Sequence, residues 1–165
     1  MWCHHPQTLL AQRLIAEGVV GDVAYIRAAL SVSVGPGDIR RTGRLGGGAS
    51  LDPGCYCLSA IRLFGGQPLS VSAARVVDTV PGGDLRLAAT LTLPHDALGQ
   101  FDVALDYPRR DELEIIGTAG KITVPDPWLC RLGFLGSGLP RSGPGGARAA
   151  TACRPRPPSR SRPHR

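Results

Sequence analysis

Residues 85–124, LRLAATLTLPHDALGQFDVALDYPRRDELEIIGTAGKITV, decide the fold of this chain. They contain four short runs of β-branched and other apolar residues, which is typical of strands. The runs are separated by turn signals at 94–96, 107–108 and 118–120. A parallel crossover needs about a dozen residues or more, so connections this short predict antiparallel neighbours.

Two further strand-like runs lie outside this stretch. Residues 71–79 precede it across the turn at 81–84, and residues 23–34 form an earlier run that ends at Gly35-Pro36-Gly37. The six predicted strands are 23–34, 71–79, 85–93, 98–106, 111–117 and 121–124.

Two helices are predicted before the sheet residues. Residues 8–18 place apolar side chains at helical spacing, with Thr8 as a candidate N-cap and Gly18 as the stop. Residues 49–64 form the second, and Pro53 fits only its first turn, so this helix should begin near Leu51 or Asp52. The sequence therefore predicts an α+β fold: a mostly antiparallel sheet of about six strands with two helices on one face.

The charge of the chain is unevenly distributed. The formal net charge is +6, yet residues 130–165 contain eight arginines and no acidic residue, while residues 1–129 carry a net charge of −2. Residues 130–165 are rich in Arg, Pro and Gly and are expected to be disordered, because they cannot bury enough apolar area to offset their ordering entropy. A basic surface on the folded part is therefore not expected.

Composition argues against several classes of protein. No apolar run approaches the roughly 18 to 20 residues that span a bilayer. The first residues, Met1-Trp2-Cys3-His4-His5-Pro6, have no secretion-signal pattern, and the five cysteines lack C-x-x-C spacing. We expect a cytoplasmic protein with reduced thiols, no metal site, no membrane association and no specific nucleic-acid partner.

The stretch GGGASLDPGCYCLSAIR, residues 46–62, contains the candidate chemistry. Asp52 and Tyr56 are four residues apart, so both project from one face near the start of the second helix. A carboxylate and a phenol on one face can hold a polyol or exchange a proton with a hydroxyl. The structural alternative is that Asp52 caps the helix and Tyr56 lies at the edge of the core.

The same stretch resembles the G-G-G-x-L-x-D-x-G-x-[HY] signature of the Gfo/Idh/MocA family of NAD(P)-dependent oxidoreductases. Within this family, the resemblance is to the branch that includes dihydrodiol, xylose and glucose–fructose oxidoreductases. Residues 1–7, Gly18 to Val23 and the 109–125 segment resemble further parts of the family's C-terminal domain. The resemblance covers residues 1–129 and implies NAD or NADP as cofactor, a sugar or diol as substrate and a homodimer formed through the sheet.

Residue by residue, the resemblance gives Tyr56 the place of the acid/base residue and Asp52 that of the aspartate that holds substrate hydroxyls. His5 falls in a segment that lines the substrate pocket, with a solvent-exposed or helix-entry histidine as the structural alternative. Arg62, on a later turn of the same helix, is interpreted as a salt-bridging residue.

Two elements of a complete family member are not found in this sequence. It has no G-x-G-x-x-G after a first strand and no Glu-Lys-Pro; its one lysine, Lys121, lies in a predicted hairpin turn. We therefore expect a C-terminal domain fragment without its Rossmann domain, truncated at both ends, frameshifted after about residue 129 and inactive by itself. The alternatives are a non-catalytic dimerisation or scaffolding module, and a functional arginine tail that binds nucleic acid nonspecifically.

Overall fold

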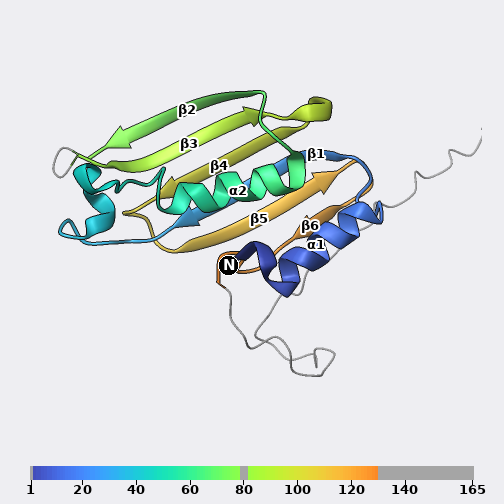
Figure 1. Cartoon of the computed structure of the whole chain (residues 1–165), viewed down its shortest axis with the longest axis horizontal. Coiled ribbons are helices and arrows are strands. Elements are labelled where there is room, and N and C mark those ends of the chain that lie inside the picture. Colours follow the sequence, from blue (N-terminus) through green and yellow to red (C-terminus); the bar gives the residue numbers. More distant parts are fainter. Residues whose placement is uncertain (1, 79–81, 130–165) are drawn as a thin grey trace, which may run out of the picture.

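The computed structural model describes residues 2–78 and 82–129. Six strands form one sheet in the order β2-β3-β4-β1-β5-β6, and both helices lie on the same side of it (Figure 1). The elements are α1 (Pro6–Ala16), β1 (Val23–Ser31), α2 (Pro53–Gly65), β2 (Ser70–Val77), β3 (Asp84–Thr92), β4 (Leu98–Ala104), β5 (Arg110–Gly117) and β6 (Lys121–Thr123). The predicted α+β fold is confirmed, and the predicted tail at 130–165 lies outside the described residues.

The sheet pairing confirms most of the predicted neighbours and corrects one. Strands β2 and β3, β3 and β4, and β5 and β6 pair antiparallel, as their short connections predict. The predicted pairing of β4 with β5 is wrong, because β1 inserts between them, parallel to β4 and antiparallel to β5. Ile26 and Ala28 of β1 are fully buried, and the centre of the sheet is where a strand can bury such side chains.

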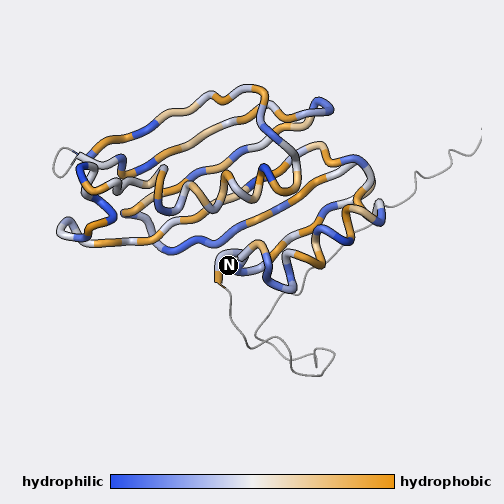
Figure 2. The backbone as a smooth tube through the Cα atoms, viewed as in Figure 1, coloured by the Kyte–Doolittle hydropathy of each residue, from blue (hydrophilic) through white to orange (hydrophobic). Residues whose placement is uncertain are grey.

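Helix α2 packs on the two central strands, β1 and β4. Pro53 occupies its first turn, as predicted, since that position needs no backbone donor. The helix approaches the sheet closely at Gly99, where a Cβ would lie 2.7 Å from Cγ2 of Ile61. Ile61 and Cys57 are fully buried between the layers. Apolar and polar residues alternate along the central strand β4, as one covered face requires (Figure 2).

Helix α1 lies toward the β6 end of the same sheet face (Figure 1) and begins two residues earlier than predicted. Its N-cap is His5, whose Nδ1 accepts a hydrogen bond from the backbone N–H of Gln7 at 3.4 Å. Thr8, the predicted cap, is buried, and its hydroxyl donates to the carbonyl oxygen of Trp2 at 2.9 Å. The error arose because a threonine followed by an apolar run matches a cap pattern even when Pro6 already starts the helix.

Candidate functional site

The carboxylate of Asp52 stands at the N-cap position of α2 without capping the helix. It is half-buried and lines a hollow of about 220 Å³. We call this cavity the α2 hollow; its lining residues are Ile39, Arg40, Leu45, Gly46, Gly47, Leu51 and Asp52. The structural alternative for Asp52, a capping carboxylate, is therefore wrong. Within residues 2–78 and 82–129 its carboxylate accepts no hydrogen bond, so it can accept them from a ligand.

Arg40 brings a guanidinium to the same hollow. Its Nε and Nη2 donate to the two carboxylate oxygens of Asp38 at 2.9 and 2.7 Å. This hydrogen bonding raises the pKa of Arg40, and the negative charge of Asp52 raises it further. With Asp38 and Asp52 ionised and Arg40 protonated, these three groups sum to one negative charge, which favours neutral hydroxyl-bearing ligands over anions.

The Asp38–Arg40 pair gives a testable pH dependence. Hydrogen bonds from the side chain and the backbone of Arg40 lower the pKa of Asp38 from 3.8 to about 2. Because the folded-state pKa is depressed, the pair stabilises the fold above the unfolded-state pKa, and this contribution disappears as the pH falls from about 4 through 2. We expect carboxyl ¹³C NMR titration to give a pKa of about 2 for Asp38 and a value between about 2 and 3.8 in Arg40→Gln, which removes the guanidinium and keeps the backbone hydrogen bond. An unchanged Asp38 pKa in that variant would contradict the pairing.

Tyr56 lies one helical turn beyond Asp52 and leaves 39% of its surface exposed. Its ring meets the Trp128 indole edge-on, with the ring centroids 6.2 Å apart and the planes at 60°. Trp128 in turn packs edge-on against Trp2, with the centroids 5.4 Å apart. Tyr56 therefore lies at the rim of an aromatic cluster, with part of the side chain accessible to a ligand.

Asp84 fixes the loop that leads into α2, although the sequence assigned it only to a turn. Its carboxylate accepts hydrogen bonds from the backbone N–H of Ser50 at 2.7 Å and from the Ser50 hydroxyl at 2.9 Å. Its backbone carbonyl accepts from Ala49 N–H at 2.6 Å, and a Cβ on Gly48 would collide with the carboxylate. Asp84 is 8% exposed. No sequence pattern couples position 84 to position 50, because the contact joins residues 34 apart.

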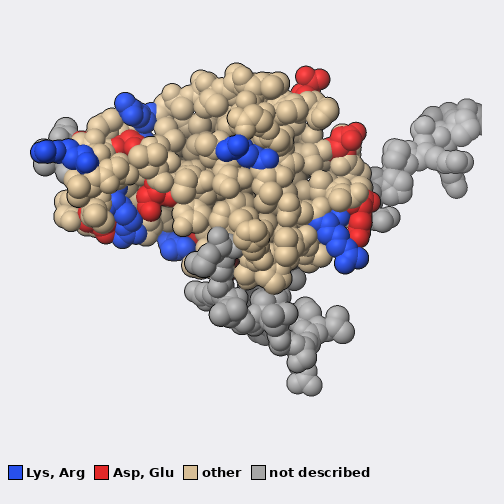
Figure 3. Space-filling model, in the orientation of Figure 1, with Lys and Arg blue, Asp and Glu red and all other residues tan. Residues whose placement is uncertain are grey.

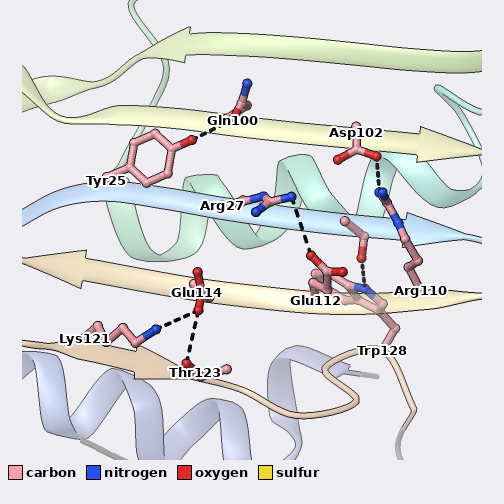
Figure 4. Close-up of polar contacts among 11 residues, drawn as sticks. Tyr25, Arg27, Gln100, Asp102, Arg110, Glu112, Glu114, Lys121, Thr123 and Trp128 are labelled. Carbon is pink, nitrogen blue, oxygen red and sulfur yellow. Dashed lines mark hydrogen bonds and ion pairs between the residues drawn. The ribbon is translucent and has the colours of Figure 1, made fainter. Parts of the chain in front are cut away.

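The remaining predicted residues lie in different surroundings. His5 is half-buried and is engaged in capping α1, as its structural alternative predicted. Arg62 makes no ion pair within residues 2–78 and 82–129, so the salt-bridge interpretation is not supported. It lines a separate hollow of about 290 Å³ with Cys3, Ser59, Leu63 and Gln67. Lys121 pairs with Glu114 at 3.1 Å on the sheet face opposite α2 (Figure 4).

The two cysteines of α2 differ in their surroundings. Burial raises the pKa of the Cys57 thiol. Burial also raises the pKa of Cys55, and the charge of Asp52 adds to that shift. Neither thiol is therefore placed as a thiolate nucleophile. Within the described part of the chain, no group of three or more His, Cys, Asp and Glu side chains gathers to hold a metal ion.

The described helices are too short or too polar to cross a bilayer. Charged side chains on the helix-bearing side gather toward both ends of the molecule, and the middle of this side carries little charge apart from a Lys or Arg side chain near its centre (Figure 3). Large apolar side chains are exposed on α1 and at both ends of α2: Leu9, Leu10, Leu51 and Leu63.

Comparison with known proteins gives consistent matches. Residues 8–123 match the model of the GFO/IDH/MocA C-terminal domain. A dTDP-3,4-didehydro-2,6-dideoxy-alpha-D-glucose 3-reductase of Actinomadura kijaniata is 32% identical over 138 residues, which is 80% of this chain and 39% of the relative. A trans-1,2-dihydrobenzene-1,2-diol dehydrogenase of Danio rerio is 31% identical over 81% of this chain and 40% of its own length.

Solved structures agree with these matches. A 3-ketoreductase from Actinomadura kijaniata, solved with NADP and TDP-benzene, superposes with a TM-score of 0.68 at 28% identity, over 74% of this chain and 39% of that one. The chain thus spans about two fifths of the length of the relatives it matches.

Proposed function

Because the chain belongs to the GFO/IDH/MocA C-terminal domain family, we propose that it is the substrate-side domain of an NAD(P)-dependent oxidoreductase acting on the CH–OH group of a sugar or diol. The observation that carries the proposal is the pair formed by Asp52, whose carboxylate is not used in capping, and the exposed Tyr56 one turn later. The domain is proposed to comprise residues 1–129.

In this proposal Asp52 and Tyr56 have different roles, substrate binding and proton transfer. Asp52, in the α2 hollow, accepts hydrogen bonds from substrate hydroxyls and so orients the carbon that reacts. Tyr56 exchanges a proton with the hydroxyl on that carbon as general acid or base. His5, at the start of α1, is proposed to contact the substrate through Nε2, because its Nδ1 is the capping atom.

The described residues do not themselves fit a dinucleotide. The glycine loop at 46–48 leads into the N-terminus of α2, where a pyrophosphate would be attracted, but the carboxylates of Asp52 and Asp84 place negative charge there. The nicotinamide, which supplies hydride acceptance when bound, is therefore proposed to be held by a separate nucleotide-binding domain. The helix side, whose middle carries little charge and whose leucines are exposed, suits such a neighbour (Figure 3).

A two-domain protein tests this function. Residues 1–129 are joined to the part of the Actinomadura reductase that precedes its matched segment, and reduction of NAD and NADP is followed with aldoses, nucleotide sugars and diols. We expect turnover from this chimera and little or none from the 165-residue chain by itself. A folded chimera inactive on the whole panel would contradict the proposal, and robust turnover by the chain would contradict the need for a second domain.

A second proposed role is homodimerisation through the sheet face that the helices leave uncovered. This face bears hydrogen-bonded and paired side chains across the three strands β4, β1 and β5 (Figure 4): Tyr25 with Gln100 at 2.7 Å, Arg27 with Glu112 at 3.8 Å, and Arg110 with Asp102. A layer of aligned donors and acceptors can form hydrogen bonds with the same layer of a second copy related by a two-fold axis. Dimerisation would also serve a non-catalytic scaffolding module.

Light scattering tests the dimer. We expect a dimer for the wild-type chain and a Kd raised about tenfold or more by Glu112→Lys, which places a like charge beside Arg27. Glu17→Lys, at the C-cap of α1 beside Arg13, is the matched control and should leave the dimer intact. A monomeric wild-type chain, or equal effects of both substitutions, would contradict the proposed interface.

A further inference from the structure

We propose that Trp128 is a positioning residue for Tyr56: its indole, fixed to the sheet and to Trp2, holds the phenol ring in one orientation at the rim of the site. The inference rests on the proposed function of Tyr56 as the group that exchanges the proton. Trp128 lies in the segment that follows β6, outside the family signature at 46–62.

Trp128 is itself firmly held. Its Nε1 donates a hydrogen bond to the carbonyl oxygen of Ala29 in the central strand β1 at 3.1 Å (Figure 4). One edge packs against Trp2 with the planes at 82°, and the indole is 9% exposed. A buried indole with its single donor satisfied has little freedom to rotate.

The turn before Trp128 is anchored at a second point. Asp126 adopts a positive φ of 45°, and its carbonyl oxygen accepts from Leu129 N–H at 3.1 Å and from Gln7 Nε2 at 3.3 Å. The segment after β6 is thereby tied to α1 and to the sheet together.

Tyr56 has no comparable anchor of its own. Within the described residues its hydroxyl makes no hydrogen bond, and its side chain projects from an exposed helical position. Such a side chain has more than one staggered χ1 orientation available on a helix. The edge-to-face contact with Trp128 favours one relative orientation of the two rings, so the indole selects among these rotamers.

NMR of the 165-residue chain with ¹³C-labelled tyrosine tests this selection. The chain contains three tyrosines, at 25, 56 and 107, and Tyr→Phe substitutions assign their ring signals. We expect the ring current of Trp128 to displace the Tyr56 ring signals from those of free tyrosine. In Trp128→Leu this displacement should fall by about half or more, while Tyr25 and Tyr107 stay in place and report an intact fold. Trp2→Phe, which keeps the indole beside Tyr56, is the matched control and should retain most of the displacement.

Two results would overturn the proposal: Tyr56 signals that stay in place in Trp128→Leu, or signals that move as much in Trp2→Phe as in Trp128→Leu. If Trp128→Leu does not fold, Trp128→Phe is used, since it keeps a ring but removes the bond to Ala29. In Trp128→Phe we expect the Tyr56 ring signals to have a smaller displacement than in the wild type and broader lines. Unchanged signals would overturn the proposal. The NMR measurement involves no turnover. An inactive chimera together with a displaced Tyr56 signal would therefore contradict the proposed function and still support the contact between the two rings.

Discussion

Replacing Tyr56 with phenylalanine should lower kcat of the two-domain chimera about 100- to 10,000-fold, because a positioned general acid or base contributes about that much to the rate. The substitution removes one oxygen and keeps the ring that packs on Trp128. The fold and the hollow beside Asp52 should therefore be unchanged, and KM should change much less than kcat. Steady-state kinetics at several pH values provides both numbers.

Two companion variants make the Tyr56 experiment specific. Tyr107→Phe, at a tyrosine that lies beside Arg86 rather than beside α2, should leave kcat unchanged. Asp52→Asn keeps the size of the side chain and removes its charge, so it should raise KM at least as much as it lowers kcat, as expected for a group that holds substrate hydroxyls. A Tyr56→Phe chimera with more than half the wild-type kcat would refute the proton-transfer role.

Asp84→Ala should lower the free energy of unfolding by about 3 kcal/mol, because hydrogen bonds to a charged acceptor contribute about 1.5–3 kcal/mol each. The substitution removes the acceptor of both the Ser50 amide and the Ser50 hydroxyl in a site that is 8% exposed. Urea unfolding of the chain measures the loss. Asp84→Asn, which keeps one carbonyl acceptor, should lose less.

The matched control for Asp84 is another aspartate with strong but more exposed bonds. Asp106 accepts three hydrogen bonds from Arg86, whose side chain is 43% exposed. Asp106→Ala should lower the free energy of unfolding much less than Asp84→Ala does, since exposed ion pairs contribute little. Equal losses for the two variants would contradict the view that Asp84 holds the loop before α2 through buried bonds.

The local elements of the fold were predictable from the sequence because their signals are local. Strand boundaries follow from apolar runs between turn residues, and the start of α2 follows from Pro53, whose ring tolerates only the first turn of a helix. The i, i+4 spacing of Asp52 and Tyr56 fixes a common helical face before any packing is considered. The resemblance to the Gfo/Idh/MocA signature used the same contiguous residues, and the family match confirms it.

The order of the strands and the surroundings of the site were decided by tertiary structure. Strand β1 inserts between β4 and β5, where its side chains are buried on the sheet face under α2. The short connection from β4 to β5 gives no sign that a third strand lies between them. Asp84 reaches Ser50, and Trp128 reaches Ala29 and Tyr56, across 34 to 99 positions of sequence. The sequence by itself therefore determined the elements, the family and the residues that could act. The tertiary structure decided which side chains contact and orient those residues. Such contacts depend on the summed burial of many residues and not on any local sequence pattern.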